Sequence, residues 1–121
     1  MYKSAGRLVH LDGELVPYEE AKVHILTPAV KYGASVFEGI CGYATRDGGG
    51  VNIFRLREHL IRLQQSMHIL RYDRTYSLEE LTEVVLDTVR ANDVRTDSHI
   101  RLQAHVLGEG LMGACGPVGL S

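Results

Sequence analysis

The chain has 121 residues, of which 45% are hydrophobic and 23% are charged, and its net charge is −2. This length allows one domain with one modest core, and the composition is ordinary for a globular protein. The near-neutral charge, without a basic block, argues against nucleic-acid and membrane-surface partners, and the short apolar runs exclude a transmembrane helix.

The first 30 residues or so predict a hairpin and then an extended segment. Asp12-Gly13 separates two short alternating runs, which is a strong signal for a two-residue hairpin turn. Residues 22 to 26 alternate polar and apolar side chains and predict a short strand or an extended segment. Thr27 followed by Pro28 fits the cap and the first position of a short helical turn.

The middle of the chain predicts two strands joined by a turn. Residues 35 to 44 are rich in strand-favouring side chains, but Gly39 and Gly42 interrupt them. A glycine inside a strand often marks a bulge or the close approach of another group. Three consecutive glycines, 48 to 50, predict a turn, and residues 51 to 54 return as the second strand.

Two helices are predicted next. The first has its apolar side chains on one helical face, at Leu56, Leu60, Leu63, Met67 and Leu70. The second begins at Ser77, which forms a capping-box motif with Glu80, and it should end near Asn92. Its buried stripe comprises Leu78, Leu81, Val84, Val85 and Val89.

A last strand and a tail complete the predicted elements. Residues 98 to 106 alternate again and predict a strand, whereas residues 108 to 121 are rich in glycine, contain Pro117 and predict a loop or a linker. The sum is an α+β fold in which two helices pack on an antiparallel sheet.

Motifs taken singly carry little chemistry. The six histidines have no HExxH spacing, so no metal site is expected, and no P-loop, GxGxxG or GxSxG is present. Glu58-His59 is more typical of a helix-surface pair than of a catalytic dyad. The two cysteines, Cys41 and Cys115, lie outside any CxxC pair and no signal peptide is indicated, so we expect free thiols in a reducing cytoplasm, with a disulfide between them as the weaker alternative.

The order of four segments is more specific than any single motif. The segments are Ala21-Lys22-Val23-His24-Ile25, then Tyr32-Gly33-Ala34-Ser35-Val36-Phe37-Glu38-Gly39-Ile40, then Phe54-Arg55-Leu56-Arg57-Glu58-His59-Leu60-Ile61-Arg62-Leu63, and then His99-Ile100-Arg101. In this order they resemble the branched-chain amino acid aminotransferases, which are class IV pyridoxal-phosphate-dependent aminotransferases. The resemblance covers roughly residues 8 to 113.

The resemblance implies the small N-terminal domain of a fold-type IV enzyme, over residues 1–113, with residues 114–121 as the start of an interdomain linker. Pyridoxal 5′-phosphate would lie between this domain and a larger one. The lysine that forms a Schiff base with the cofactor is expected beyond residue 121, because neither Lys22 nor Lys31 matches its position. No catalytic residue is therefore assigned within the chain.

Two arginines match anion-binding positions of the family. Arg62 matches the arginine that binds the cofactor phosphate, where a guanidinium fork replaces lost hydration in fixed geometry. Arg101 matches an arginine that helps to hold the substrate carboxylate, and its apolar neighbours on a predicted strand suggest a buried charge in need of an anionic partner. The rival interpretations are a solvated helix arginine and a structural ion pair. We expect the guanidinium groups of Arg62 and Arg101 to lie at the mouth of one hollow. If both groups were instead paired with Asp or Glu far from any shared hollow, the assignment would be contradicted.

Three further residues match the pocket for the substrate side chain. Tyr32 and Phe37 match aromatic positions, and a pocket for leucine, isoleucine or valine needs such apolar walls. Gly39 matches a glycine whose missing side chain leaves room for substrate. Core packing of the two aromatic side chains and a β-bulge at Gly39 are the alternatives.

The chain departs from the family pattern at two positions. Cys41 replaces an arginine of the usual FEGIR run, which puts in doubt how the second carboxylate of glutamate is held. His99 stands where the family often has tyrosine, and the charge of a histidine varies near neutral pH.

The resemblance implies a homodimeric, cytoplasmic enzyme of branched-chain amino acid biosynthesis. It would transfer the amino group of leucine, isoleucine or valine to 2-oxoglutarate. The alternatives are a D-amino acid aminotransferase or an aminodeoxychorismate lyase of the same fold and, in another class, a non-catalytic truncated domain. We expect the 121 residues alone to be inactive and to self-associate through exposed apolar surface.

Overall fold

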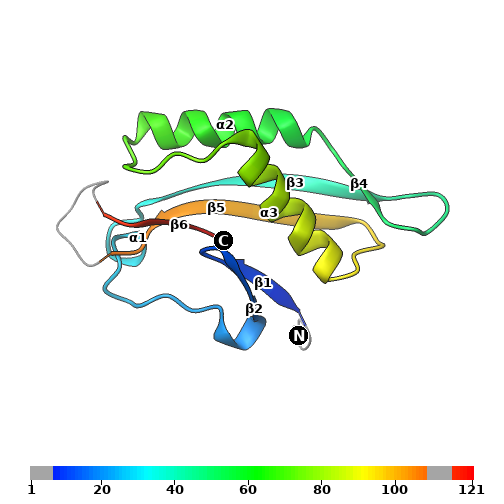
Figure 1. Ribbon diagram of the computed structural model, residues 1–121, viewed down its shortest axis with the longest axis horizontal. Coiled ribbons are helices and arrows are strands. Elements are labelled where there is room, and N and C mark those ends of the chain that lie inside the picture. The colour runs from blue at the N-terminus through cyan, green and yellow to red at the C-terminus, as the bar shows by residue number, and fades with distance from the viewer. Residues whose placement is uncertain (1–6, 109–115) are drawn as a thin grey trace.

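The computed structural model describes residues 7–108 and 116–121. The elements, in chain order, are β1 (Leu8–Leu11), β2 (Glu14–Pro17), the 3-10 turn η1 (Tyr18–Glu20), α1 (Pro28–Lys31), β3 (Ser35–Ala44), β4 (Val51–Ile53), α2 (Leu56–Ile69), α3 (Leu78–Ala91), β5 (Ser98–Val106) and β6 (Val118–Leu120). A four-stranded antiparallel sheet has the order β4-β3-β5-β6, and β1 and β2 form a separate hairpin (Figure 1). The predicted α+β fold, with two helices packed on an antiparallel sheet, is confirmed.

The core lies between the sheet and the two long helices. Alternate residues of β5, such as Leu102 and Ala104, point to this side, where they meet Leu60 and Leu63 of α2 and Leu81 of α3. Each of these five side chains is at most 2% exposed. Burial of one leucine contributes roughly 1.5–3 kcal/mol, so this layer holds the helices on the sheet.

Helix α3 begins as the sequence predicts. The Ser77 hydroxyl accepts a hydrogen bond from the Glu80 backbone N–H at 3.1 Å, and the Glu80 carboxylate accepts one from the Ser77 backbone N–H at 2.7 Å. This capping box satisfies two backbone donors that the first helical turn would otherwise leave without partners.

The other face of the sheet presents the odd-numbered residues of β3 and β5. Phe37 and Arg101 are exposed on this face, whereas their neighbours Glu38 and Leu102 are buried on the helix side. The antiparallel register places Gly39 opposite Arg101. Pairing in this register gathers residues that are far apart in sequence into one surface, which we call the open face.

The segment after the hairpin differs from the prediction of a strand, whereas the short helical turn that follows it is confirmed. Residues 22 to 26 form no strand, and residues 25 and 26 lie in a turn that the Thr27 N–H closes on the His24 carbonyl at 3.1 Å. The helical turn after Thr27 does begin with Pro28, but the Thr27 hydroxyl makes no capping bond. An alternating pattern forms a strand only where a partner strand is within reach, and here none pairs with it among the described residues.

The tail also differs from the prediction. A loop or linker was expected from residue 108, but Val118–Leu120 pair with β5 as strand β6 and are buried. The prediction of a loop is therefore wrong for these three residues, since a short run beside Gly116 and Pro117 has no periodicity that would reveal a strand. The domain boundary expected after residue 113 lies outside the described residues.

Across residues 7–108 and 116–121, no helix has the length and apolar character required to cross a membrane. Within the same ranges, no group of three or more His, Cys, Asp or Glu side chains is arranged to hold a metal ion.

Candidate functional site

The open face brings together three of the predicted substrate residues. The guanidinium carbon of Arg101 lies 3.9 Å from the centre of the Phe37 ring, a cation–π arrangement between neighbouring strands. Gly39 is the direct cross-strand partner of Arg101. A positive charge, an aromatic wall and a residue without a side chain thus lie next to one another.

Arg101 is more exposed than its sequence neighbours suggested. Ile100 and Leu102 point toward the helices, so Arg101 points the other way, and the expectation of a buried charge is wrong. Its Nε donates a hydrogen bond to the Gln103 side-chain oxygen at 3.3 Å, and no Asp or Glu pairs with it in the described part of the chain. The guanidinium therefore keeps most of its donors for an external anion.

His99 occupies the space beside Gly39. A Cβ added to Gly39 would lie 2.9 Å from the His99 Nε2, which is closer than van der Waals contact allows. The glycine therefore makes room for an imidazole of the open face rather than for an empty volume. His99 is also the cross-strand partner of Cys41, so both departures from the family pattern lie side by side.

Cys41 is a free thiol. Its side chain hydrogen-bonds to the Tyr43 hydroxyl, and this contact raises the pKa of Tyr43. Its conceivable disulfide partner, Cys115, lies outside the described residues.

Among the described residues, Tyr32 forms no hydrogen bond and no ring contact with this group. It caps the C-terminal end of α1, is 47% exposed, and carries the Lys31 ammonium 5.0 Å from its ring centre. It remains a predicted pocket residue.

Arg62 lies on the other side of the sheet, in an ion pair that we did not predict. Its Nε and Nη2 donate to the two carboxylate oxygens of Glu38 at 2.7 and 2.6 Å, and His59 Nδ1 lies 2.8 Å from the Glu38 Oε2. Burial alone would raise the pKa of Glu38, but the hydrogen bonds from Arg62 and His59 outweigh it and lower that pKa. The same bonds raise the pKa of Arg62, so both groups are ionised near neutral pH.

The signal for this cluster was present in the sequence pattern. Glu38 alternates with Phe37 and Gly39, so it had to face the helix layer, and His59 and Arg62 are three residues apart on one helix face. The prediction paired His59 with its neighbour Glu58 as a surface pair, whereas the partner found is Glu38.

The two arginines do not share one hollow. Arg62 lines a shallow cavity of about 340 Å³ with Arg55, Glu58 and His59, whereas Arg101 lines a cavity of about 610 Å³ between β5, α3 and β1. Arg62 is held by the Glu38 carboxylate, whereas Arg101 has no acidic partner in the described part of the chain. The expectation of a single shared mouth is therefore wrong for this chain, while each arginine keeps a surface at which an anion could bind.

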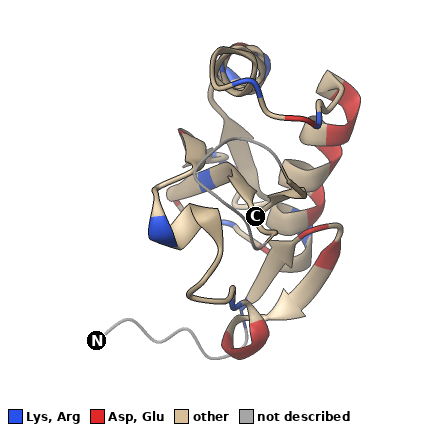
Figure 2. Cartoon of the chain, turned by 90° about the vertical axis from the view of Figure 1, so that its left-hand side faces the viewer, with Lys and Arg blue, Asp and Glu red and all other residues tan. Residues whose placement is uncertain are grey.

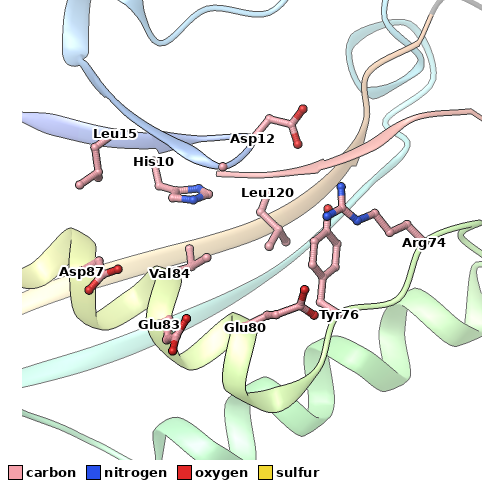
Figure 3. A pocket seen from close by; sticks show the side chains of 11 residues that line it. His10, Asp12, Leu15, Arg74, Tyr76, Glu80, Glu83, Val84, Asp87 and Leu120 are labelled. Atoms are coloured by element: carbon pink, nitrogen blue, oxygen red, sulfur yellow. The ribbon is translucent and has the colours of Figure 1, made fainter.

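A third cavity is acidic. It has a volume of about 400 Å³ and lies between the β1–β2 hairpin and α3 (Figure 3). Its charged lining comprises Asp12, Glu80, Glu83, Asp87 and Arg74. Figure 2 shows the acidic residues gathered along α3. An excess of carboxylates repels a phosphate, so this cavity does not suit an anionic cofactor.

The amino-acid sequence is similar to those of branched-chain-amino-acid aminotransferases. The chain matches no protein-family model. It is 42% identical over 113 residues to the branched-chain-amino-acid aminotransferase of Escherichia coli (strain K12), which covers 93% of this chain and 35% of the relative. It is 38% identical over 104 residues to the corresponding protein of Pseudomonas aeruginosa, which covers 86% of this chain and 33% of the relative.

Solved structures agree with these relatives. The Thermoproteus uzoniensis branched-chain aminotransferase superposes with a TM-score of 0.79 at 44% identity, over 87% of this chain and 35% of that one. The Escherichia coli branched-chain amino acid aminotransferase also gives a TM-score of 0.79, at 34% identity, over 95% of this chain and 39% of that one. The chain spans about a third of the length of the curated relatives that it matches. In sequence and in fold, the chain is therefore similar to the branched-chain aminotransferases over that third.

Proposed function

We propose that this chain forms the small N-terminal domain of a pyridoxal-phosphate-dependent branched-chain aminotransferase. The complete protein transfers the amino group of leucine, isoleucine or valine to 2-oxoglutarate. The observation that carries the proposal is the stacking of Arg101 on Phe37, next to its cross-strand partner Gly39, in a chain similar to enzymes of that name. We place the domain at residues 1–113, and strand β6, which lies beyond this boundary, pairs with its strand β5.

The substrate side of the proposal rests on the open face. Arg101 holds the carboxylate by charge-assisted hydrogen bonds, since its guanidinium has no acidic partner in the described part of the chain. Phe37 is 54% exposed and offers an apolar wall for the aliphatic side chain. We assign Tyr32 to the same pocket on the family resemblance alone. A structure of the Thermoproteus uzoniensis relative with norvaline agrees with an aliphatic amino acid as ligand.

The cofactor side of the proposal rests on Arg62. Relatives have been solved in a PLP-form and with pyridoxamine 5′-phosphate. The Arg62 side chain is 65% exposed, although its partner Glu38 is buried. The Nη1 of Arg62 has no partner among the described residues, so the outer edge of the guanidinium fits a phosphate. When bound, the cofactor supplies the electron sink for the reaction, and its Schiff-base lysine belongs to residues beyond 121.

The assembly and location of the complete protein are part of the proposal. We propose a homodimer in the cytoplasm that binds small amino acids and 2-oxo acids. Exposed apolar side chains of the segment after the hairpin, such as Val23, Ile25 and Leu26, offer surface for a partner subunit or domain.

Steady-state kinetics of the full-length protein tests this function. Leucine with 2-oxoglutarate should be turned over at a far higher kcat/KM than D-alanine with the same acceptor. Preference for D-alanine would instead identify a D-amino acid aminotransferase, and lyase activity on aminodeoxychorismate would identify the other relative of this fold. The 121-residue chain by itself should be inactive, and its turnover of leucine would contradict the proposed division of labour.

A further inference from the structure

We propose that Glu38 is a positioning residue, which fixes the guanidinium of Arg62 so that its outer edge is presented to the cofactor phosphate. This inference rests on the proposed function, because it deepens the role given to Arg62. Glu38 itself would not contact the phosphate.

The geometry of the ion pair supports this role. Arg62 uses Nε and Nη2, which lie on one edge of the guanidinium, and the two bonds are 2.7 and 2.6 Å long. A two-pronged pair of this kind fixes the plane and direction of the guanidinium, whereas a single bond would leave it free to rotate. The remaining donors, at Nη1 and the second N–H of Nη2, then point away from the carboxylate.

The burial of the two partners is opposite. The Glu38 side chain is 3% exposed, whereas that of Arg62 is 65% exposed. The carboxylate therefore lies behind the guanidinium, and the cavity at the start of α2 is lined by Arg62, Arg55, Glu58 and His59 but not by Glu38. An anion in this cavity meets the outer edge of Arg62 without meeting the buried carboxylate.

Two further features hold Glu38 in place. The residues of β3 before and after Glu38 pair with β5, and Glu38 itself lies opposite Leu102. His59, one turn before Arg62 on α2, lies 2.8 Å from the same Glu38 oxygen that Arg62 Nη2 contacts. The carboxylate is thus bound to a sheet and to two positions of one helix, which makes it a rigid support for a long side chain.

The experiment compares two ligands on the full-length protein. Dissociation constants are measured for pyridoxal 5′-phosphate and for pyridoxal, which lacks the phosphate, in the wild type and in Glu38→Gln. A glutamine places an amide N–H where a carboxylate oxygen accepted from Arg62 or His59, so the fork is lost. We expect binding of pyridoxal 5′-phosphate to weaken about tenfold or more, as for a lost bond to a charged group, while binding of pyridoxal changes little.

Three variants make the test specific. Glu83→Gln removes an exposed carboxylate that lines the acidic cavity and not the cavity of Arg62, and it should bind both ligands like the wild type. Glu38→Asp keeps the charge but withdraws the carboxylate by one methylene, and should give an intermediate loss even if Glu38→Gln folds poorly. The double variant Glu38→Gln/Arg62→Gln should bind no more weakly than Arg62→Gln alone, because Glu38 acts through Arg62.

The outcomes separate this inference from the proposed function. If Arg62→Gln leaves pyridoxal 5′-phosphate binding unchanged, the cofactor role of Arg62 fails and this inference fails with it. If Arg62→Gln weakens it but neither Glu38 variant does, only the positioning role is overturned. Equal weakening of both ligands in the Glu38 variants would show a merely structural role and would also overturn it.

Discussion

The guanidinium of Arg101 lies over the ring of Phe37, 3.9 Å from its centre, on the face of the sheet that the long helices do not cover. The aromatic ring limits the directions in which this long side chain can point. An exposed contact of this type contributes only about 0.5–1 kcal/mol, so its value lies in orientation more than in stability.

Replacement of Arg101 by glutamine should impair substrate binding without unfolding the protein. In the full-length enzyme we expect KM for leucine and for the 2-oxo acid to rise about tenfold or more, because a bond to a charged group is lost. The melting temperature should change little, since Arg101 is exposed. Unchanged KM values would contradict the assignment of Arg101 to the substrate carboxylate.

A methyl group at Gly39 should displace His99. In Gly39→Ala the new Cβ would lie 2.9 Å from the imidazole Nε2, and the exposed ring can swing away at little cost in stability. We expect KM for leucine to rise in this variant and to recover in part when His99→Ala is added. A double-mutant cycle measures this coupling, which should be about 0.5–3 kcal/mol, and simple additivity would argue against it.

Burial of His105 should make stability depend on pH. Desolvation lowers its pKa below the ordinary 6.5, although the charge of Asp12 opposes part of this shift. Below pH 6.5, His105 is therefore protonated more readily in the unfolded chain than in the folded chain. The free energy of unfolding should fall as the pH falls.

Urea unfolding of wild type and His105→Leu, from about pH 7.5 to about pH 5, checks this window. The substitution should remove part of the pH dependence. His68→Gln, at an exposed position of α2, is the control and should retain it. Parallel curves for wild type and His105→Leu would show that His105 is not the source.

Strand β6 should contribute to stability although its sequence is typical of a linker. Leu120 is 3% exposed and belongs to the core, so Leu120→Ala should lower the free energy of unfolding by about 2–5 kcal/mol. Leu15 is 39% exposed, and Leu15→Ala should change it by only about 0.5 kcal/mol. Equal effects in urea unfolding of the two variants would mean that β6 is not part of the folded unit.

Local patterns in the sequence determined the fold class, the two long helices and the longest strands. The capping box of Ser77 and Glu80 acts between residues three apart, and the apolar stripes of α2 and α3 repeat within one helix, so both are legible without knowledge of the rest. The same holds for the period-two alternation of β5. Family resemblance, carried by short motifs, led to Arg62, Phe37, Gly39 and Arg101.

Only the tertiary structure decided what those residues touch. Glu38 and Arg62 are 24 positions apart, and their pairing depends on how α2 lies on β3. The stacking of Arg101 on Phe37 and the place of His99 over Gly39 depend on one register between β3 and β5, since a slip of one residue would turn every side chain to the other face. Strand β6 is stable only because β5 is there to pair with it, and no property of three residues by themselves encodes that partner.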